Sequence, residues 1–164
     1  MRTWASWSKG TYTKTVVVAY DTMYGMTEKC LNSIVKGVGE AGGTVLSFNL
    51  SEDTAVDALA ALIEAPALIV GSPTYEHEIF PKVVDFLNFL KTKKFSNRCA
   101  SVFGSFGWSG EATRKLSVAL TELGFELVGQ PLSVFGNPTK EDLEKARELG
   151  KTVAEKAFSK YDAV

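Results

Sequence analysis

The residues whose types and spacing point most clearly to chemistry lie at positions 20–28, Tyr-Asp-Thr-Met-Tyr-Gly-Met-Thr-Glu, directly after the β-branched run 15–19. The run predicts a strand, and the turn that follows it leads into a helical pattern. The first N–H groups of a helix have no partners within the helix, and the helix dipole is positive there, so this turn could bind a phosphate without Lys or Arg. Thr22 and Thr27 would add hydroxyl groups, and Gly25 would let the backbone approach the anion closely. The alternative is an ordinary turn in which Thr27 caps the helix.

Two later loops also follow strand candidates directly, and each carries an aromatic side chain. Residues 72–79 follow the apolar run 67–71 and contain Tyr75, and residues 105–111 follow a further strand candidate and contain Trp108. In an open α/β sheet, a ligand lies beyond the carboxyl ends of the strands, where the strand order reverses. A ligand with a phosphate at one end and a flat ring at the other, such as a nucleotide base or a flavin, would satisfy all three loops. For either aromatic residue alone, ordinary packing is the simpler interpretation.

Simple magnitudes indicate that the aromatic loops matter as much as the phosphate loop. An anion at a helix N-terminus gains up to roughly 2 kcal/mol, whereas nanomolar binding needs about 12 kcal/mol. Burying roughly 200 Å² of aromatic surface at about 25 cal/mol per Å² supplies on the order of 5 kcal/mol. We therefore expect the turn at 20–28 to anchor the ligand and the two aromatic loops to supply much of the affinity.

Strand and helix patterns alternate along the whole chain and would bring the three loops to one edge of a sheet. The apolar strand candidate at 67–71 is what a strand covered on both faces should look like. The pattern predicts an α/β fold, with an open parallel sheet and helices on both faces. The expected strands are 15–19, 44–50, 67–71, 99–105 and 125–135, the last one broken or bent near 129–131, and the expected helices begin at Thr27, Ser51, Pro81, after residue 111 and at Thr139 with Asp142 in a capping box.

Composition excludes several classes of function. The chain has 164 residues, 45% of them hydrophobic, which is enough for one domain with a full core. Its 18 basic and 19 acidic residues are interspersed, which argues against nucleic acid or an anionic membrane as the main partner. Two distant cysteines and a single histidine indicate neither a zinc site nor a disulfide framework. No apolar run is long enough to span a membrane, and we expect a reducing, cytoplasmic environment.

Two possible motifs do not support a function of their own. Residues 37–42 match the pattern G-x-G-x-x-G, but a dinucleotide fingerprint follows a strand and opens a helix, whereas this one closes a helix and precedes a strand. A phosphoacceptor receiver domain would need an acidic pair after the first strand and a lysine after the fifth. Asp21 stands alone, and no lysine precedes Pro138.

Together, the three loops resemble those of a flavodoxin-like FMN domain, and more narrowly the flavodoxin domain of A-type flavoproteins, the flavodiiron oxygen and nitric oxide reductases. The resemblance rests on residues 20–29, on Gly71–Thr74 and on Gly104–Gly110, with further similarity at 138–143. It implies a three-layer sandwich around a five-stranded parallel sheet of order 2-1-3-4-5. By position, the phosphate would be held by Thr22, Met23, Tyr24, Gly25, Met26 and Thr27, and the isoalloxazine ring would lie between Pro73, Thr74, Tyr75 and Glu76 on one side and Ser105, Phe106, Gly107, Trp108, Ser109 and Gly110 on the other. Phe106 stands where a tyrosine is common in the family.

The resemblance implies electron relay through FMN, with no catalytic or metal-binding residues in this chain. Electrons would come from a donor such as rubredoxin or an NAD(P)H-linked reductase and pass to a di-iron site in a β-lactamase-like domain, in the same polypeptide or a partner subunit. Residues 76–78 lie beside the expected ring edge, where they could bias the flavin potentials or recognise a partner, unless they are simply a solvated loop. Residues 1–14, which include Trp4 and Trp7, are interpreted as an N-terminal arm or the remnant of an interdomain linker, and residues 15–164 as an excised FMN domain.

Two other functions remain open. A free-standing FMN-dependent NAD(P)H:quinone-type reductase would consume pyridine nucleotide directly, which an electron-transfer domain would not do without a separate reductase. A flavin-free interaction module on the same fold would be colourless and would ignore added FMN.

Overall fold

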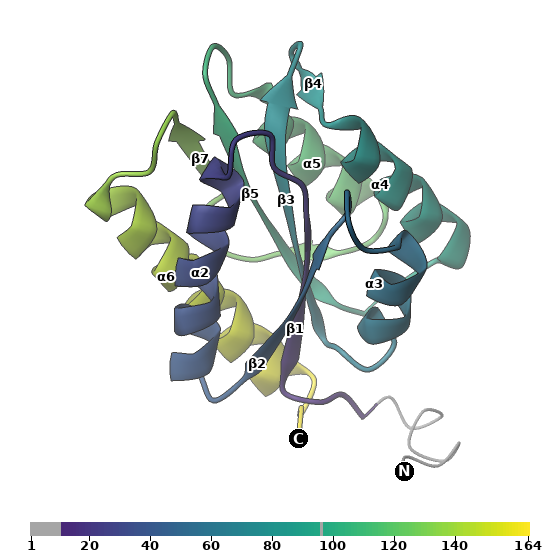
Figure 1. Cartoon of the computed structure of the whole chain (residues 1–164). Helices are drawn as coiled ribbons and strands as arrows, with labels where there is room; N and C mark the ends of the chain where they lie inside the picture. Colours follow the sequence, from purple (N-terminus) through teal and green to yellow (C-terminus); the bar gives the residue numbers. More distant parts are fainter. Residues whose placement is uncertain (1–10, 96) are drawn as a thin grey trace.

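Twelve helices and strands follow one another along residues 11–95 and 97–164, the part of the chain that the computed structural model describes. Strand and helix alternate as the sequence predicts (Figure 1). The elements are β1 (Thr15–Tyr20), α2 (Met26–Glu40), β2 (Thr44–Asn49), α3 (Ala55–Leu62), β3 (Ala67–Tyr75), β4 (Glu78–Ile79), α4 (Pro81–Lys93), β5 (Cys99–Phe106), α5 (Glu111–Glu122), β6 (Glu126–Leu127), β7 (Leu132–Phe135) and α6 (Lys140–Lys160).

The sheet has the expected strand order. Its path is β2-β1-β3-β5-β6, all parallel, and β7 also pairs with β5, in register Phe103↔Leu132. Counting β6 and β7 as one interrupted strand gives the predicted order 2-1-3-4-5. The interruption lies between Leu127 and Leu132, where Pro131 has no N–H to donate to a ladder. The one addition is β4, which pairs antiparallel with the end of β3.

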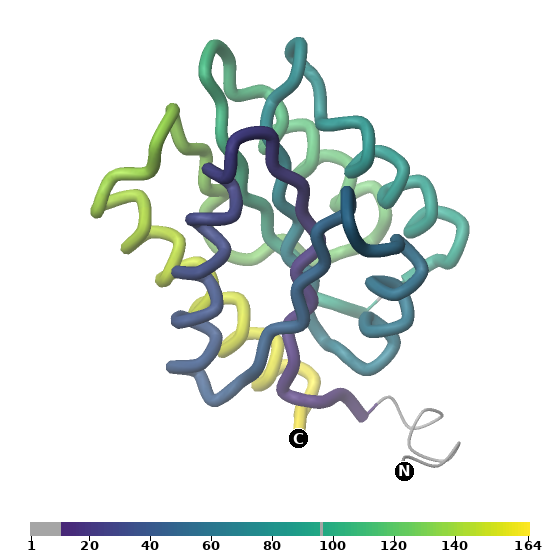
Figure 2. Tube along the Cα trace, viewed as in Figure 1, coloured from purple at the N-terminus to yellow at the C-terminus, as the bar shows by residue number. Residues whose placement is uncertain are grey.

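Alternate residues of the strands build two separate hydrophobic cores, because successive side chains of a strand point to opposite faces. In β1, Val16 and Val18 face α2 and α6, whereas Val17 and Ala19 face α3, α4 and α5. All four residues are completely buried. Figure 1 shows the two helical layers on either side of the sheet, and the tube in Figure 2 shows that the loops after β1, β3 and β5 gather at the end of the sheet opposite the C-terminus.

The start of the described chain packs beside its C-terminus. The Lys14 N–H donates to the Val164 carbonyl at 2.9 Å, and the Val164 N–H donates to the Tyr12 carbonyl at 2.9 Å. The Tyr12 ring also meets Tyr161 edge to face, with ring centroids 5.6 Å apart. Residues 11–14 of the predicted arm therefore contact the domain, while Trp4 and Trp7 lie outside the described residues.

Arg98 joins the start of β5 to the end of α3. Its Nε donates to the carbonyls of Leu62 and Ala65 at 3.1 Å each, and its Nη2 donates to the Ile63 carbonyl at 3.2 Å. The Leu62 and Ile63 carbonyls lie at the C-terminus of α3, where carbonyl groups have no partners within the helix, although the Leu62 carbonyl also accepts from the Ala65 N–H at 3.3 Å.

Replacing Arg98 by methionine is expected to lower the free energy of unfolding by about 1–3 kcal/mol, because the change keeps the aliphatic volume but leaves the α3 carbonyls without this donor. Urea unfolding followed by circular dichroism measures the loss. The exposed Arg114 on α5 offers the matched control, since Arg114→Met should change stability by less than about 0.5 kcal/mol. Equal effects of the two substitutions would contradict the structural role of Arg98.

Candidate functional site

The loop after β1 is organised by its own side chains and leaves the N-terminus of α2 open. The Gly25 N–H donates to Thr22 Oγ1 at 2.9 Å, and the Thr22 N–H donates to Asp21 Oδ1 at 2.7 Å. Gly25 is the N-cap residue of α2, with a φ of 76° that favours glycine, and within the described chain no side chain caps this helix. The first N–H groups of α2 are therefore available to an anion, and Thr27 is not the N-cap that the ordinary-turn alternative required.

Thr27 lies inside the first turn of α2 and is completely buried. Its hydroxyl lies 3.1 Å from Ser105 Oγ, and either oxygen could donate. Thr27 and Ser105 thus tie the loop after β1 to the end of β5 beneath the site.

The stretch after residue 71 continues β3 to Tyr75 and forms a hairpin, whereas the sequence predicted a loop. β3 continues through Tyr75, and Tyr75 pairs with Glu78 of β4 across the turn residues Glu76 and His77. The Phe80 N–H donates to Ser72 Oγ at 3.0 Å and closes the base of the hairpin. This hairpin is one wall of the site.

The loop after β5 forms the opposite wall. Trp108 stands at its tip with 90% of its surface exposed. Ser109 Oγ lies 3.0 Å from His77 Nδ1, and the Ala112 N–H donates to Thr74 Oγ1 at 3.2 Å, so both contacts reach the hairpin. α5 begins here, with Gly110 as its N-cap residue.

The three loops predicted to act together enclose one pocket of about 310 Å³. A hollow of about 170 Å³ adjoins it and is shared between the hairpin and the Trp108 loop. Of the predicted site residues, Met23, Tyr24, Met26, Pro73, Thr74, Ser105, Phe106, Gly107 and Trp108 line the pocket, and Thr74, Glu76, Trp108 and Ser109 line the hollow. The other predicted residues line neither: Thr22, Gly25 and Thr27 shape the first loop, Tyr75 packs edge to face on Phe80 at 5.9 Å, and Gly110 is the N-cap residue of α5.

A fourth loop, after β7, also reaches the pocket and was not predicted as part of the site. Gly136 lines the pocket, and its N–H donates to the Phe106 carbonyl at 2.8 Å. The Phe135 ring lies 5.5 Å from the Phe106 ring, and Lys29 Nζ on α2 donates to Asn137 Oδ1 at 2.6 Å. The signal was present, because the sequence ends its fifth strand at residue 135 and parallel strands end at the same edge of the sheet.

The charged groups of the site meet at the start of α5. Hydrogen bonds from the Ser109 hydroxyl, and after it from the Glu111 backbone N–H and from His77, hold the pKa of the Glu111 carboxyl below its usual range. Glu111 Oε1 lies 3.3 Å from His77 Nδ1. Within residues 11–95 and 97–164, no group of three or more His, Cys, Asp or Glu side chains could hold a metal ion.

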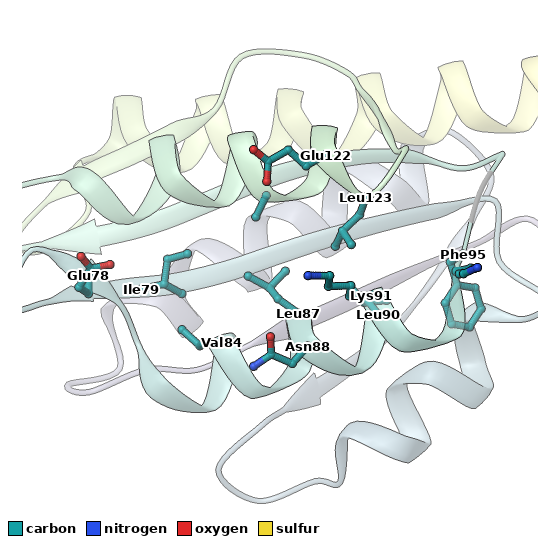
Figure 3. A pocket seen from close by; sticks show the side chains of 12 residues that line it. Glu78, Ile79, Val84, Leu87, Asn88, Leu90, Lys91, Phe95, Glu122 and Leu123 are labelled. Carbon is teal, nitrogen blue, oxygen red and sulfur yellow. The ribbon is translucent and has the colours of Figure 1, made fainter.

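A larger cavity, of about 790 Å³, lies between α4 and α5 (Figure 3). Its floor includes Leu87, Leu90 and Leu123, and its rim carries Lys91 and Glu122. It lies along the helical layer and reaches the site hairpin only through β4. No described residue of the loops after β1 and β5 lines this cavity. Its larger volume alone therefore does not make it the candidate functional site.

The order of the strands and the pocket at their carboxyl ends define a doubly wound α/β domain with a pocket at the switch point of the sheet. The profile of the flavodoxin family matches residues 18–150, and the chain therefore belongs to the flavodoxin family.

Similar proteins are mostly longer than this chain. The rubredoxin-oxygen oxidoreductase of Megalodesulfovibrio gigas is 34% identical over 92% of this chain and 38% of its own length, and the nitric oxide reductase of Moorella thermoacetica is 34% identical over 92% and 38%. The chain thus spans about two fifths of these curated relatives. The crystal structure of the flavodiiron protein from Giardia intestinalis superposes with a TM-score of 0.88 at 25% identity, over 96% of this chain and 40% of that one. A flavodoxin from the domain Archaea, by contrast, is covered over 98% of its length, with a TM-score of 0.79 and 27% identity.

No helix in the described part of the chain is long and apolar enough to cross a membrane.

Proposed function

We propose that this chain is an FMN-binding electron-transfer domain, the flavodoxin part of a flavodiiron oxygen or nitric oxide reductase. The observation that carries the proposal is the meeting of three chemically different loops around one pocket. One loop presents an open helix N-terminus, and the other two present Pro73 and Trp108. The chain is similar to an oxygen oxidoreductase and a nitric oxide reductase over about two fifths of the length of each. This similarity supports the narrower assignment.

The residues present fit FMN. The uncapped N-terminus of α2 suits a phosphate, because its N–H groups and dipole favour an anion. The pocket of about 310 Å³ is at the small end of the range for ligand sites, which suits a flat ring held between two walls with one edge exposed. When bound, FMN would supply the ability to accept electrons from a reductant and pass them on singly. Residues 22–27 would hold the phosphate, and residues 73–76 and 105–110 would fix the orientation of the ring.

We infer the partners from the part of the relatives that this chain does not cover. We assign the electron acceptor to a di-iron β-lactamase-like domain, in the same polypeptide or a partner subunit. The donor would be rubredoxin or an NAD(P)H-linked reductase, and the name of the Megalodesulfovibrio gigas relative supports the first. Cys30 and Cys99 are buried free thiols, which agrees with a reducing cytoplasm.

The deciding experiment is an absorption spectrum of the purified protein, followed by chromatography of the flavin released on denaturation. We expect flavin absorbance bands and FMN. FAD in the released fraction would contradict the cofactor assignment, and a colourless protein that does not bind added FMN would favour the flavin-free interaction module. Steady consumption of NADH with a quinone by the isolated chain would favour the free-standing reductase.

The double substitution Thr22→Ala, Thr27→Ala is expected to raise the Kd for FMN about 10- to 100-fold. Each change removes a hydroxyl that orders the loop after β1, and two hydrogen bonds correspond to roughly 1–3 kcal/mol. Titration of FMN fluorescence with apoprotein measures the affinity. Thr92→Ala, an exposed threonine on α4 that bonds its own helix, is the control and should leave the Kd unchanged. An unchanged Kd in the double variant would exclude this loop as the phosphate site.

A further inference from the structure

The two walls of the pocket are joined to each other by side chains as well as by the sheet beneath them. Ser109 Oγ lies 3.0 Å from His77 Nδ1, and Glu111 Oε1 lies 3.3 Å from the same nitrogen. Further from the turn, Lys115 of α5 forms an ion pair with Glu78 of β4. All these contacts run from the β3–β4 hairpin to the Trp108 loop or to α5.

The hairpin turn needs such support because of the residues that form it. Glu76 and His77 have φ values of 47° and 66°, so both central residues of a two-residue turn are left-handed. Turns of this kind match the twist of a hairpin but strongly prefer Asn and Gly, since other side chains are strained there. A turn of Glu and His is therefore held in place by contacts outside itself.

The chemistry of the three side chains defines the direction of the hydrogen bonds. The Glu111 carboxylate can only accept, so the His77 ring must carry its proton on Nδ1 to donate to it. The Ser109 hydroxyl donates to Glu111, which holds the pKa of that carboxyl below its usual range. Glu111 Oε2 is buried and accepts no hydrogen bond from the described residues, so this carboxylate is tethered by Ser109, His77 and the Glu111 backbone N–H.

We propose that His77, Ser109 and Glu111 form a latch that positions the hairpin wall of the pocket and thereby sets how tightly the flavin ring is held. His77 and Glu76 line the hollow of about 170 Å³ opposite Trp108, so a shift of the turn changes the space between the two walls. In this role His77 and Glu111 are positioning residues. The flavin part of this inference rests on the proposed function, whereas the joining of the two walls does not.

The substitution His77→Gly distinguishes a role of the His77 side chain as a latch from a role of this residue in the turn conformation. Glycine adopts the φ of 66° without strain, so a residue that mattered only for the turn would be improved by it. If the side chain acts as a latch, His77→Gly instead raises the Kd for FMN about tenfold and speeds hydrogen exchange of the hairpin amides about tenfold. Glu111→Gln, which keeps size but not charge, should have a similar effect. His77→Asn, which tolerates positive φ and keeps an N–H donor near the backbone, should recover part of the loss.

The double variant tests whether the two side chains act through one contact. His77→Gly with Glu111→Gln should be no worse than the stronger single change, and additive effects would overturn the latch. Glu122→Gln, at the far end of α5, is the control and should leave Kd and exchange unchanged. The latch is also overturned if His77→Gly binds FMN as tightly as the wild-type chain or exchanges no faster. If the wild-type chain does not bind FMN, the proposed function fails and the exchange rates of the apoprotein alone decide whether the walls are latched.

Discussion

Replacing Gly37 by alanine is expected to destabilise the protein by about 3 kcal/mol, although the position lies in a helix, where alanine is normally preferred. A Cβ at Gly37 would lie 1.9 Å from the Arg147 carbonyl oxygen, which belongs to the backbone of α6 and cannot rotate away. The two helices would have to separate, and overpacking of this kind typically costs about 1–3 kcal/mol or more. For a chain of this length the loss lowers Tm by roughly 6–12 °C. Thermal and urea unfolding measure it.

The same helix provides a matched control two residues away. A Cβ at Gly39 would meet nothing within 4 Å, so Gly39→Ala should stabilise the protein by roughly 0.5–1 kcal/mol, the usual gain of alanine over glycine in a helix. Gly150 on α6 tests the contact from its other side, because a Cβ there would lie 2.3 Å from the Ile34 carbonyl oxygen. Stabilisation by Gly37→Ala would show that α2 and α6 do not approach this closely.

The surroundings of these glycines also bear on the G-x-G-x-x-G pattern at residues 37–42. The sequence argument rejected a dinucleotide fingerprint because the pattern closes a helix, and the structure confirms that it lies at the end of α2, before β2. Gly37 is needed for helix packing, and Gly42, with a φ of 81°, for the turn into β2. Two of the three glycines at fingerprint spacing thus arise from requirements that involve no ligand, whereas nothing in the described part of the chain requires a glycine at Gly39.

Much of the fold could be predicted because local signals and burial agree. The apolar run 67–71 and the β-branched run 15–19 are central strands, and Pro131 interrupts the fifth strand as expected. The capping box of Thr139 and Asp142 at the start of α6 is confirmed, with the Asp142 N–H donating to Thr139 Oγ1 at 3.2 Å. In each case a physical requirement of the backbone is met by residues within a few positions.

Where the prediction failed, the deciding contact is distant in sequence or the usual signal is missing. α3 begins at Ala55 and not at Ser51, because the Ser51 hydroxyl donates to Asp21 Oδ2 at 2.7 Å and Thr54 caps the helix instead. The β3–β4 hairpin was missed because its turn lacks the Asn and Gly that mark such turns. The turn is held from α5, more than thirty positions further along the chain, as the 34-residue separation of His77 and Glu111 shows.

Removing the Trp108 side chain is expected to have the largest effect on FMN binding of any single substitution in the site. Trp108 lines both the pocket and the hollow, and 90% of its surface is exposed in the chain by itself. Stacking of a flat ring on an aromatic side chain contributes about 1–3 kcal/mol, so Trp108→Ala should raise the Kd for FMN about 10- to 100-fold. Trp108→Phe keeps an aromatic face and should lose much less. Titration of FMN fluorescence with each apoprotein gives the comparison.

The exposure of Trp108 makes this test selective for binding. A side chain that contacts so little of its own domain contributes little to folding, so Trp108→Ala should leave the Tm of the apoprotein within about 1–2 °C of the wild-type value. The FMN-loaded protein should lose Tm, because ligand binding stabilises the folded state in proportion to the logarithm of affinity. An unchanged Kd with an unchanged Tm would mean that the ring does not lie against this loop, whereas a large loss of Tm in the apoprotein would mean that Trp108 is a packing residue. Only weaker binding with an intact apoprotein agrees with a ring held between the hairpin and Trp108.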